Sequence, residues 1–148
     1  DMMKWPVNFP TFYLVDRWME VPTARGDSSM SQAWHDRNFA RMQERIKQFG
    51  TRPVILRGSS SSVCSDVPNG TLGLLYIDGD HTYDGVMQDL KLWVPKVVFG
   101  GGVGVHDYEN PSYGVKQALQ KYCQERGFTI HTLPENKPED AGAWFYVE

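Results

Sequence analysis

The chain has 148 residues, of which 41% are hydrophobic and 22% are charged, and its formal net charge is -3. This size supports one domain with a buried core, and the small acidic charge gives no support to a nucleic-acid or membrane-surface partner. No apolar run approaches the roughly 18 residues that a membrane span needs. Cys64 and Cys123 are too few and too far apart for a disulfide framework or a zinc site, so we expect reduced thiols and a cytoplasmic location.

The first part of the chain alternates predicted strands and helices. Residues 11–15 are β-branched and aromatic, which favours a buried strand. Apolar residues recur at spacings of three and four between residues 31 and 49, which predicts one face of a helix. Residues 54–56 predict a second strand, and residues 60–67 predict a short helix.

The second part continues this alternation and then changes. Strands are predicted at residues 72–77 and 101–105, and between them a helix at 83–94 with Val86, Leu90 and Trp93 facing inward. A further helix has an apolar face from Val115 to Tyr122 and ends at Gly127. The last two predicted strands, 128–133 and 143–147, are joined by a polar connection that is too short for a parallel crossover, so we expect them to be antiparallel.

The predicted order of elements is β-α-β-(α)-β-α-β-α-β-β. Alternating strands and helices imply an α/β fold, with a mainly parallel, doubly wound sheet that carries helices on both faces. The closing antiparallel hairpin is a more particular feature of the fold. No repeat or linker interrupts the pattern, so we interpret residues 1–148 as a single domain.

Carboxylate and imidazole side chains follow two of the predicted strands. Asp78, Asp80 and His81 come directly after the strand at 72–77, and His106 and Asp107 come directly after the strand at 101–105. Because the carboxyl ends of parallel strands meet at one edge of a sheet, we expect these side chains to gather in one crevice. Two or more carboxylates and two imidazoles in one place indicate a metal site, an acid/base site, or both.

The fold and these motifs resemble the class I, Rossmann-like S-adenosylmethionine-dependent methyltransferases. One branch of that family is similar to this chain in an Asp-Gly-Asp-His-x-Tyr segment, here residues 78–83, and in a His-Asp-Tyr segment, here residues 106–108. Residues 114–118 also match its usual run, as do residues 13–18 and 56–60 less specifically. The resemblance implies S-adenosylmethionine as the cofactor.

The chain departs from this family at its beginning. The family opens with a strand and a glycine-rich turn that cradles the methionine end of the cofactor, and nothing before Asp16 provides that turn. The strand at 11–15 resembles the second strand of the fold, which implies an N-terminally truncated domain without its first, central strand. Exposed apolar edges would follow from this, and they favour a homo-oligomer.

The resemblance implies a role for two residues near the first strand. Asp16, at the end of that strand, is expected to accept hydrogen bonds from the ribose hydroxyls of the cofactor, and the alternative is a cap or turn residue. Trp18 is expected to stack on adenine or substrate, as is Tyr108. For both aromatic rings the alternative is packing.

The other cofactor residues that the resemblance implies lie after the next two strands. Gly58, Ser59 and Ser60 would meet the adenine edge through small side chains and backbone N–H groups. For Ser59 an N-cap of the following helix is an equal alternative. Asp78 and Gly79 would contribute cofactor contacts from the end of the strand at 72–77.

The resemblance also implies the catalytic residues. Asp78, His106 and Asp107 would bind a hard divalent ion such as magnesium and position a hydroxyl acceptor. His81 would take the proton of that hydroxyl, because an imidazole accepts a proton near neutral pH. The alternatives are a pocket lined by the two aspartates without a metal, and a capping or core histidine that Asp80 holds.

The expected activity is methyl transfer from S-adenosylmethionine to an oxygen of a small-molecule acceptor, with sugars as one candidate class. One rival is a catalytically silent domain that only binds a partner. A second rival, a nucleotide-binding oxidoreductase, lacks the required glycine turn, since Gly100–Gly102 precede a strand rather than follow one. The remaining polar residues are interpreted as structural or surface histidines and as a solvated helix face: His35 and His131, and Asp84, Asp89, Lys91 and Lys96.

Overall fold

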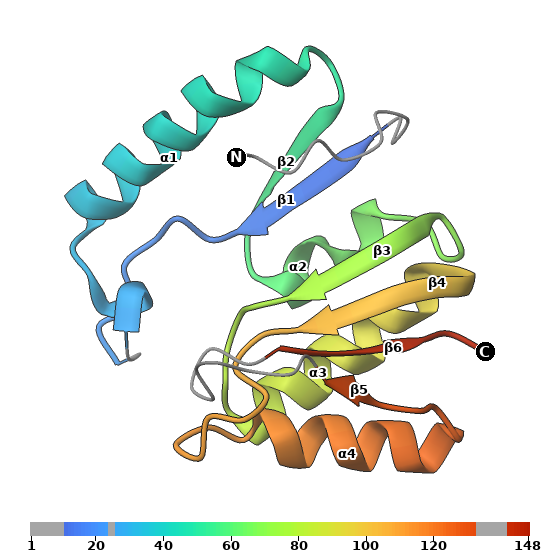
Figure 1. The fold of residues 1–148 in the computed structure, drawn as a ribbon. Coiled ribbons are helices and arrows are strands. Elements are labelled where there is room, and N and C mark those ends of the chain that lie inside the picture. Colours follow the sequence, from blue (N-terminus) through green and yellow to red (C-terminus); the bar gives the residue numbers. More distant parts are fainter. Residues whose placement is uncertain (1–10, 24–25, 133–141) are drawn as a thin grey trace. The chain divides into compact units, whose positions relative to one another are not determined.

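The computed structural model describes residues 11–23, 26–132 and 142–148. The chain forms two compact units, Asp1–Val63 and Cys64–Glu148, which we call the N-terminal unit and the C-terminal unit. Figure 1 shows the elements of each unit. Among the described residues, no helix is both long enough and apolar enough to cross a lipid bilayer.

The N-terminal unit contains a parallel pair of strands joined by a helix. β1 (Phe12–Asp16) pairs with β2 (Pro53–Arg57) in register from end to end, and α1 (Gln32–Ile46) forms the crossover between them. The shorter elements are 3-10 turns at Gly26–Ser29 and Lys47–Phe49 and the helix α2 at Ser60–Val63. The predicted order of strands and helices is therefore confirmed in this unit.

The predicted face of α1 packs against the strands only in part. Phe39, Met42 and Ile46 are half-buried, and Phe49 contacts the ring of Phe12 at a centroid distance of 5.5 Å. β1 was expected to be buried, but its side chains are half-buried and Asp16 is exposed. The apolar run identified the strand correctly and overstated how deeply it is covered.

The C-terminal unit contains a four-stranded sheet in the order β3-β4-β6-β5. Its strands are β3 (Leu72–Ile77), β4 (Val97–Val105), β5 (His131–Thr132) and β6 (Ala143–Tyr146). β3 and β4 are parallel, whereas β6 is antiparallel to both β4 and β5. The expected closing antiparallel hairpin is thus confirmed, and residues 133–141 of its connection lie outside the described residues.

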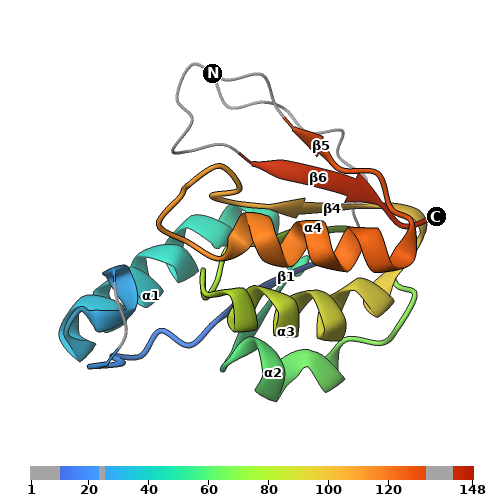
Figure 2. The same ribbon diagram turned by 90° about the horizontal axis from the view of Figure 1, so that it is seen from below.

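Two helices cover one face of this sheet, as Figure 2 shows from below. α3 (Tyr83–Trp93) and α4 (Val115–Arg126) pack their apolar faces against the strands. The 3-10 turns of this unit are Cys64–Asp66 and Val94–Lys96. The residues with no exposed surface are Leu90, Val103, Val115, Ala118, Leu119 and Phe145. The predicted inward face of α3 is therefore confirmed.

The glycines of β4 allow side chains from β3 to lean across the opposite face of the sheet. A Cβ atom on Gly104 would lie 2.9 Å from the ring of Tyr76, and one on Gly102 would lie 3.4 Å from Leu74. Side chains of the neighbouring strand therefore occupy the space that these glycines leave. Leu74 and Tyr76 are both more than half exposed on this face.

Two of the residues predicted to lie on a solvated helix face are buried. Asp89 is 8% exposed and Lys96 is 5% exposed, whereas Asp84 and Lys91 are exposed as expected. The ammonium group of Lys96 donates a hydrogen bond of 2.7 Å to the carbonyl oxygen of Val67. The Lys96 ammonium group thus has a hydrogen-bond acceptor from another segment inside the protein, although the helical pattern predicts this residue at the surface.

Candidate functional site

The carboxyl ends of β3 and β4 lie side by side in the C-terminal unit. Ile77 and Val105 are register partners, and the backbone N–H of His106 donates to the carbonyl oxygen of Ile77 at 3.0 Å. Asp78 and Asp107 follow these strand ends directly. The parallel pairing therefore brings together the residues that the sequence placed at one sheet edge.

Four side chains form what we call the acid–imidazole cluster: Asp78, His81, His106 and Asp107. Nε2 of His81 lies 3.3 Å from Oδ1 of Asp78 and 3.4 Å from Oδ2 of Asp107. Nδ1 of His106 lies 3.5 Å from Oδ1 of Asp78 and 3.2 Å from Oδ1 of Asp107. Each imidazole is thus flanked by both carboxylates.

The segment before α3 places His81 by local hydrogen bonds. Thr82 caps α3, since its side-chain oxygen accepts from the backbone N–H of Gly85 at 3.1 Å. Oδ1 of Asp80 accepts from the backbone N–H of Thr82 at 2.9 Å and so stabilises the turn. Asp78 and Asp107, rather than Asp80, therefore flank His81.

A second loop covers His81 and was not singled out from the sequence. The ring of Tyr113 stacks on His81 with a centroid distance of 4.6 Å and an interplanar angle of 21°. The backbone N–H of Gly114 donates to the carbonyl oxygen of His81 at 2.9 Å. A Cβ atom on Gly114 would lie 2.3 Å from the backbone nitrogen of Tyr83, so only glycine fits. The signal that the sequence offered for this loop was Gly114, which directly precedes the apolar pattern of α4.

Asp107 has an unusual backbone conformation. Its φ angle is +54°, a region that few residues other than glycine adopt, although aspartate tolerates it better than most. The residue is 9% exposed, and its carbonyl oxygen accepts from the N–H of Asn110 at 3.2 Å. Such strain persists where the surrounding structure fixes a side chain in one orientation, as functional sites often require.

The electrostatic effect of the cluster is visible at Tyr76. Burial raises the pKa of the Tyr76 hydroxyl, and the negative charges of Asp78 and Asp107 raise that pKa further. The Tyr76 ring meets His106 edge-on at a centroid distance of 6.4 Å. The two carboxylates thus create a negative potential that favours a cation or a proton at this edge.

The cluster offers ligands for a divalent cation. One ligand atom each from Asp78, His81 and His106 lies within 4.8 Å of the others. Nδ1 of His106 is buried and makes no hydrogen bond within the described part of the chain. Two carboxylates suit magnesium, but imidazole nitrogen is not the oxygen ligand that magnesium prefers. The donor set can therefore hold a divalent cation, but it suits magnesium less well than a cation that accepts nitrogen ligands.

In the N-terminal unit, the side chain of Asp16 contacts the backbone of Trp18. Oδ1 of Asp16 accepts from the backbone N–H of Trp18 at 2.7 Å, which is the turn role considered as its alternative. Trp18 is 8% exposed and packs against Phe39 with ring centroids 4.9 Å apart. Tyr108, in the C-terminal unit, is 5% exposed. Both rings have the burial that packing requires, and ligand stacking by them stays a prediction.

Gly58 and Ser59 line a cleft of about 620 Å³ in the N-terminal unit. The lining residues are Arg17, Met19, Gln32, Arg57, Gly58 and Ser59. The side-chain oxygen of Ser59 accepts from the N–H of Ser62 at 3.2 Å, so Ser59 caps α2 as its alternative role proposed. A Cβ atom on Gly58 would lie 2.7 Å from Val63, which explains the glycine at this position.

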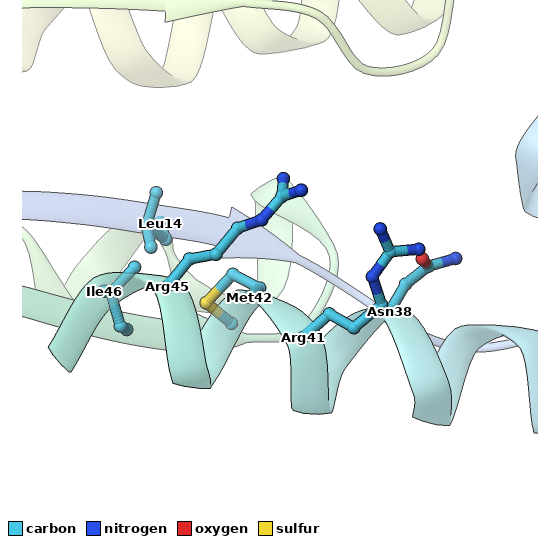
Figure 3. Close-up of a pocket in the computed structure, with 6 residues that line it drawn as sticks. All are labelled: Leu14, Asn38, Arg41, Met42, Arg45 and Ile46. Carbon is cyan, nitrogen blue, oxygen red and sulfur yellow. The ribbon is translucent and has the colours of Figure 1, made fainter.

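A second cleft of the N-terminal unit was not anticipated from the sequence. It has a volume of about 330 Å³ and is lined by Leu14, Asn38, Arg41, Met42, Arg45 and Ile46. Figure 3 shows that the arginine side chains extend from the side of α1 on which Leu14 lies. Arg41 and Arg45 are one helical turn apart, so they lie on the same side of α1. The lining of the cleft therefore combines these polar groups with apolar side chains.

Comparison with known protein families gives a match over more than half of the chain. A family model described as "Methyltransferase domain" matches residues 7–108. An uncharacterized protein named y4gI from Sinorhizobium fredii (strain NBRC 101917 / NGR234) is 27% identical over 94 residues. That alignment covers 64% of this chain and 10% of the relative.

Comparison with solved structures gives several similar folds. The O-methyltransferase NovP is 23% identical with a TM-score of 0.64, and the match covers 92% of this chain and 59% of that one. A TDP-rhamnose 3'-O-methyltransferase of calicheamicin biosynthesis is 18% identical with a TM-score of 0.61, covering 95% and 61%. The O-methyltransferase TomG from Streptomyces achromogenes, solved with SAM, is 13% identical with a TM-score of 0.59, covering 93% and 61%. The chain therefore shares their α/β methyltransferase fold and spans about three fifths of their length.

Proposed function

We propose, because the chain belongs to the methyltransferase-domain family, that it supplies the acceptor-activating part of an S-adenosylmethionine-dependent O-methyltransferase. The observation that carries this proposal is the acid–imidazole cluster at the ends of β3 and β4, where both imidazoles lie within 3.5 Å of carboxylate oxygens. Methyl transfer to an oxygen requires little more than two positioned reactants and a base. The cluster offers that base.

His81 is the proposed base. Its Nε2 faces the oxygens of Asp78 and Asp107, so these carboxylates favour an N–H at Nε2 and leave Nδ1 to accept a proton. Tyr113, stacked on the ring, limits its rotation. His81 is thereby held in one orientation by groups on both sides of it.

The proposed reaction is an in-line displacement at the sulfonium methyl group of S-adenosylmethionine. The acceptor hydroxyl gives its proton to Nδ1 of His81 while its oxygen forms a bond to the methyl carbon. The bond between that carbon and the sulfonium sulfur breaks, and its electron pair stays on the sulfur as the neutral thioether of S-adenosylhomocysteine. A divalent cation held by Asp78, His106 and Asp107 would lower the pKa of a hydroxyl beside it.

The proposed cofactor contacts are residues at the ends of β1, β2 and β3. In the N-terminal unit, the exposed carboxylate of Asp16 is proposed to accept from ribose hydroxyls, and Gly58, Ser59 and Ser60 to meet the adenine. In the C-terminal unit, Asp78 and Gly79 are proposed to contribute. The cleft beside Gly58 and Ser59 supports the adenine assignment, because it offers concave space next to small residues.

The proposed acceptor is a small molecule with a hydroxyl group. The similar fold of a TDP-rhamnose 3'-O-methyltransferase supports a sugar as one class to test first. The formal net charge of -3 gives no support to a nucleic-acid acceptor. A cytoplasmic location and a homo-oligomer stay predictions.

The experiment that tests this proposal has two steps. S-adenosylhomocysteine is titrated calorimetrically into the protein, and hydroxylated acceptors, beginning with nucleotide sugars and phenols, are then screened for methyl transfer. Binding in the micromolar range followed by turnover with an oxygen acceptor supports the proposal. Absence of binding both in this chain and in a chain extended upstream contradicts it and leaves a partner-binding domain as the better reading.

A further inference from the structure

We infer that the C-terminal unit binds a transition-metal dication such as Co²⁺ or Zn²⁺ in preference to Mg²⁺, with His106, Asp78 and Asp107 as its ligands. This inference goes beyond the proposed function, because it depends on the acid–imidazole cluster alone. It holds whether or not the protein transfers a methyl group. Four observations on the cluster lead to it.

The first observation is the state of His106. Its Nδ1 atom is buried and makes no hydrogen bond within the described residues, although oxygens of Asp107 and Asp78 lie 3.2 and 3.5 Å away. A buried polar atom without a hydrogen bond is unfavourable. A cation between these atoms would accept the nitrogen lone pair and would also offset the repulsion between the two carboxylates.

The second observation is the spacing of the ligand atoms. Nδ1 of the proposed ligand His106 lies 3.2 Å from Oδ1 of Asp107 and 3.5 Å from Oδ1 of Asp78. Ligands about 2.0–2.1 Å from a tetrahedral zinc ion lie about 3.3–3.4 Å from one another. The His106 nitrogen and each carboxylate oxygen are therefore close enough to share one small dication.

The third observation is the chemistry of the ligands. Imidazole nitrogen binds zinc, iron, cobalt and nickel well, whereas magnesium takes oxygen ligands and gives up water reluctantly. His106 supplies one nitrogen beside the two carboxylates. This nitrogen ligand moves the preference of the site away from magnesium.

The fourth observation is that the ligands are held in place before any ion binds. The backbone of His106 is bonded to Ile77 across β3 and β4, and Asp107 is fixed in its positive-φ conformation. A rigid arrangement discriminates between ions by geometry, because it cannot relax to suit the wrong one. The backbone at His106 and Asp107 is therefore held in place, which favours discrimination between ions by geometry.

The test compares Co²⁺, Zn²⁺ and Mg²⁺ by calorimetric titration of the whole protein, with the visible absorption of bound Co²⁺ as a second readout. We expect Co²⁺ and Zn²⁺ to bind at least about tenfold more tightly than Mg²⁺. His106→Asp replaces the nitrogen by an oxygen and should reduce that ratio by about tenfold or more, the size of effect known even for outer-shell partners of metal ligands.

Matched variants identify the site. His131→Asp makes the same substitution at an exposed histidine of β5 that stacks on Trp144, and it should leave the ratio unchanged. Cys64→Ser should also leave Co²⁺ binding unchanged, because the expected ligands contain no thiolate. His106→Gln removes the imidazole without adding the negative charge of His106→Asp. It should weaken Co²⁺ binding as well.

The inference is overturned by any of three results: Mg²⁺ binds as tightly as Co²⁺, no dication binds, or neither His106 variant changes the ratio. Because the cofactor is absent from these titrations, their outcome is independent of the proposed methyl transfer. Thermal unfolding of each variant shows whether weaker metal binding results from the loss of a ligand or from the loss of the folded structure.

Discussion

The two units of this protein differ in how firmly they hold their side chains. The described part of the N-terminal unit buries only Trp18, His35 and Val63, and its strands and helix are otherwise half-buried or exposed. The C-terminal unit encloses a continuous core, in which Leu90 and Phe145 have no exposed surface. A packed core fixes the ends of β3 and β4, and with them the acid–imidazole cluster.

The residues assigned to the cofactor in the N-terminal unit are positioned by polar contacts instead. Arg57 donates to the carbonyl oxygen of Trp18 at 3.0 Å, and Gln32 donates to the same oxygen at 3.2 Å. These contacts order the loop that follows Asp16. The proposed roles follow this difference: the proposed catalysis, which needs exact geometry, is assigned to the C-terminal unit, and proposed cofactor contacts, which tolerate adjustment, are assigned to the N-terminal unit.

The largest expected effect separates these two roles. His81→Gln removes the proposed base and should lower the turnover number by about 10²- to 10⁴-fold, the range typical of general-base catalysis. Asp16→Asn removes a charged acceptor for ribose hydroxyls and should mainly weaken cofactor binding, by about tenfold. Single-turnover rates and titration of S-adenosylhomocysteine measure the two effects.

His131→Gln is the control for His81→Gln, since it changes an exposed histidine of the same unit. Because His81 contacts the carboxylates of Asp78 and Asp107 and is proposed as a base rather than a ligand, His81→Gln should weaken Co²⁺ binding by no more than the about 10- to 100-fold typical of an outer-shell partner. A loss of Co²⁺ binding that parallels the loss of turnover would show that His81 acts by holding the ion.

The next effect tests the difference in packing directly. Leu90 has no exposed surface, whereas Leu14 on β1 is half-buried, so the same substitution probes both units. Leu90→Ala should lower the free energy of unfolding by about 3 kcal/mol, because it leaves a cavity in a closed core. Leu14→Ala should lower it by about 1 kcal/mol or less, because its site is already partly hydrated. Denaturant unfolding of both variants gives the comparison, and equal losses would contradict it.

A smaller effect asks whether this tight packing extends to the loop over His81. Gly114→Ala would place its Cβ 2.3 Å from the backbone nitrogen of Tyr83, so the loop must move. We expect a loss of about 2 kcal/mol in unfolding free energy, together with a changed position of the Tyr113 ring over His81. The control is Gly102→Ala, whose Cβ would meet only the flexible end of Leu74 at 3.4 Å.

The control should change stability by less than about 0.5 kcal/mol, as is usual for a substitution that the surroundings accept. Near-ultraviolet circular dichroism follows the Tyr113 ring in both variants. Equal stability of the two variants would show that the loop is loosely held and that the firm packing of the C-terminal unit ends at α4.

Much of the fold was predictable from sequence because local patterns and tertiary packing agree. The apolar run of β3 is bounded by polar residues at both ends, and its predicted limits are those observed. Gly127 adopts the left-handed conformation that ends α4, as a glycine after an apolar helical face predicts. β4 begins at Val97, earlier than predicted, because Val97 pairs with Leu72 of β3 across a register shift that the local pattern does not indicate.

The parts that could not be predicted depend on distant partners. Lys96 is buried because the carbonyl oxygen of Val67, from another segment, accepts its hydrogen bond. The clustering of Asp78 with Asp107 followed from a general rule about parallel strands, which needs only the order of elements. No such rule predicts the stacking of Tyr113 on His81, because this contact depends on the path of an irregular loop.

The smallest expected effect is a pH dependence of stability that comes from a cysteine in the core of the C-terminal unit. Burial raises the pKa of the Cys123 thiol to about 11, from a value of 9.0 when the chain is unfolded. As the pH rises above 9, the unfolded thiol ionises before the folded one, which favours the unfolded state. The stability contribution is therefore complete below pH 9 and declines toward pH 11, with a loss of about 1 kcal/mol by pH 10.

Thiol labelling extends this test to the N-terminal unit. In a Cys64→Ser background, Cys123 should react with a disulfide reagent at pH 8 only as fast as the protein unfolds, because the thiolate is the reactive species and the residue is 1% exposed. A cysteine in place of the half-buried Met42 should react faster by local opening of its less protected surroundings. Equal rates at the two positions would mean that both units open together, and the contrast in packing would then have no dynamic consequence.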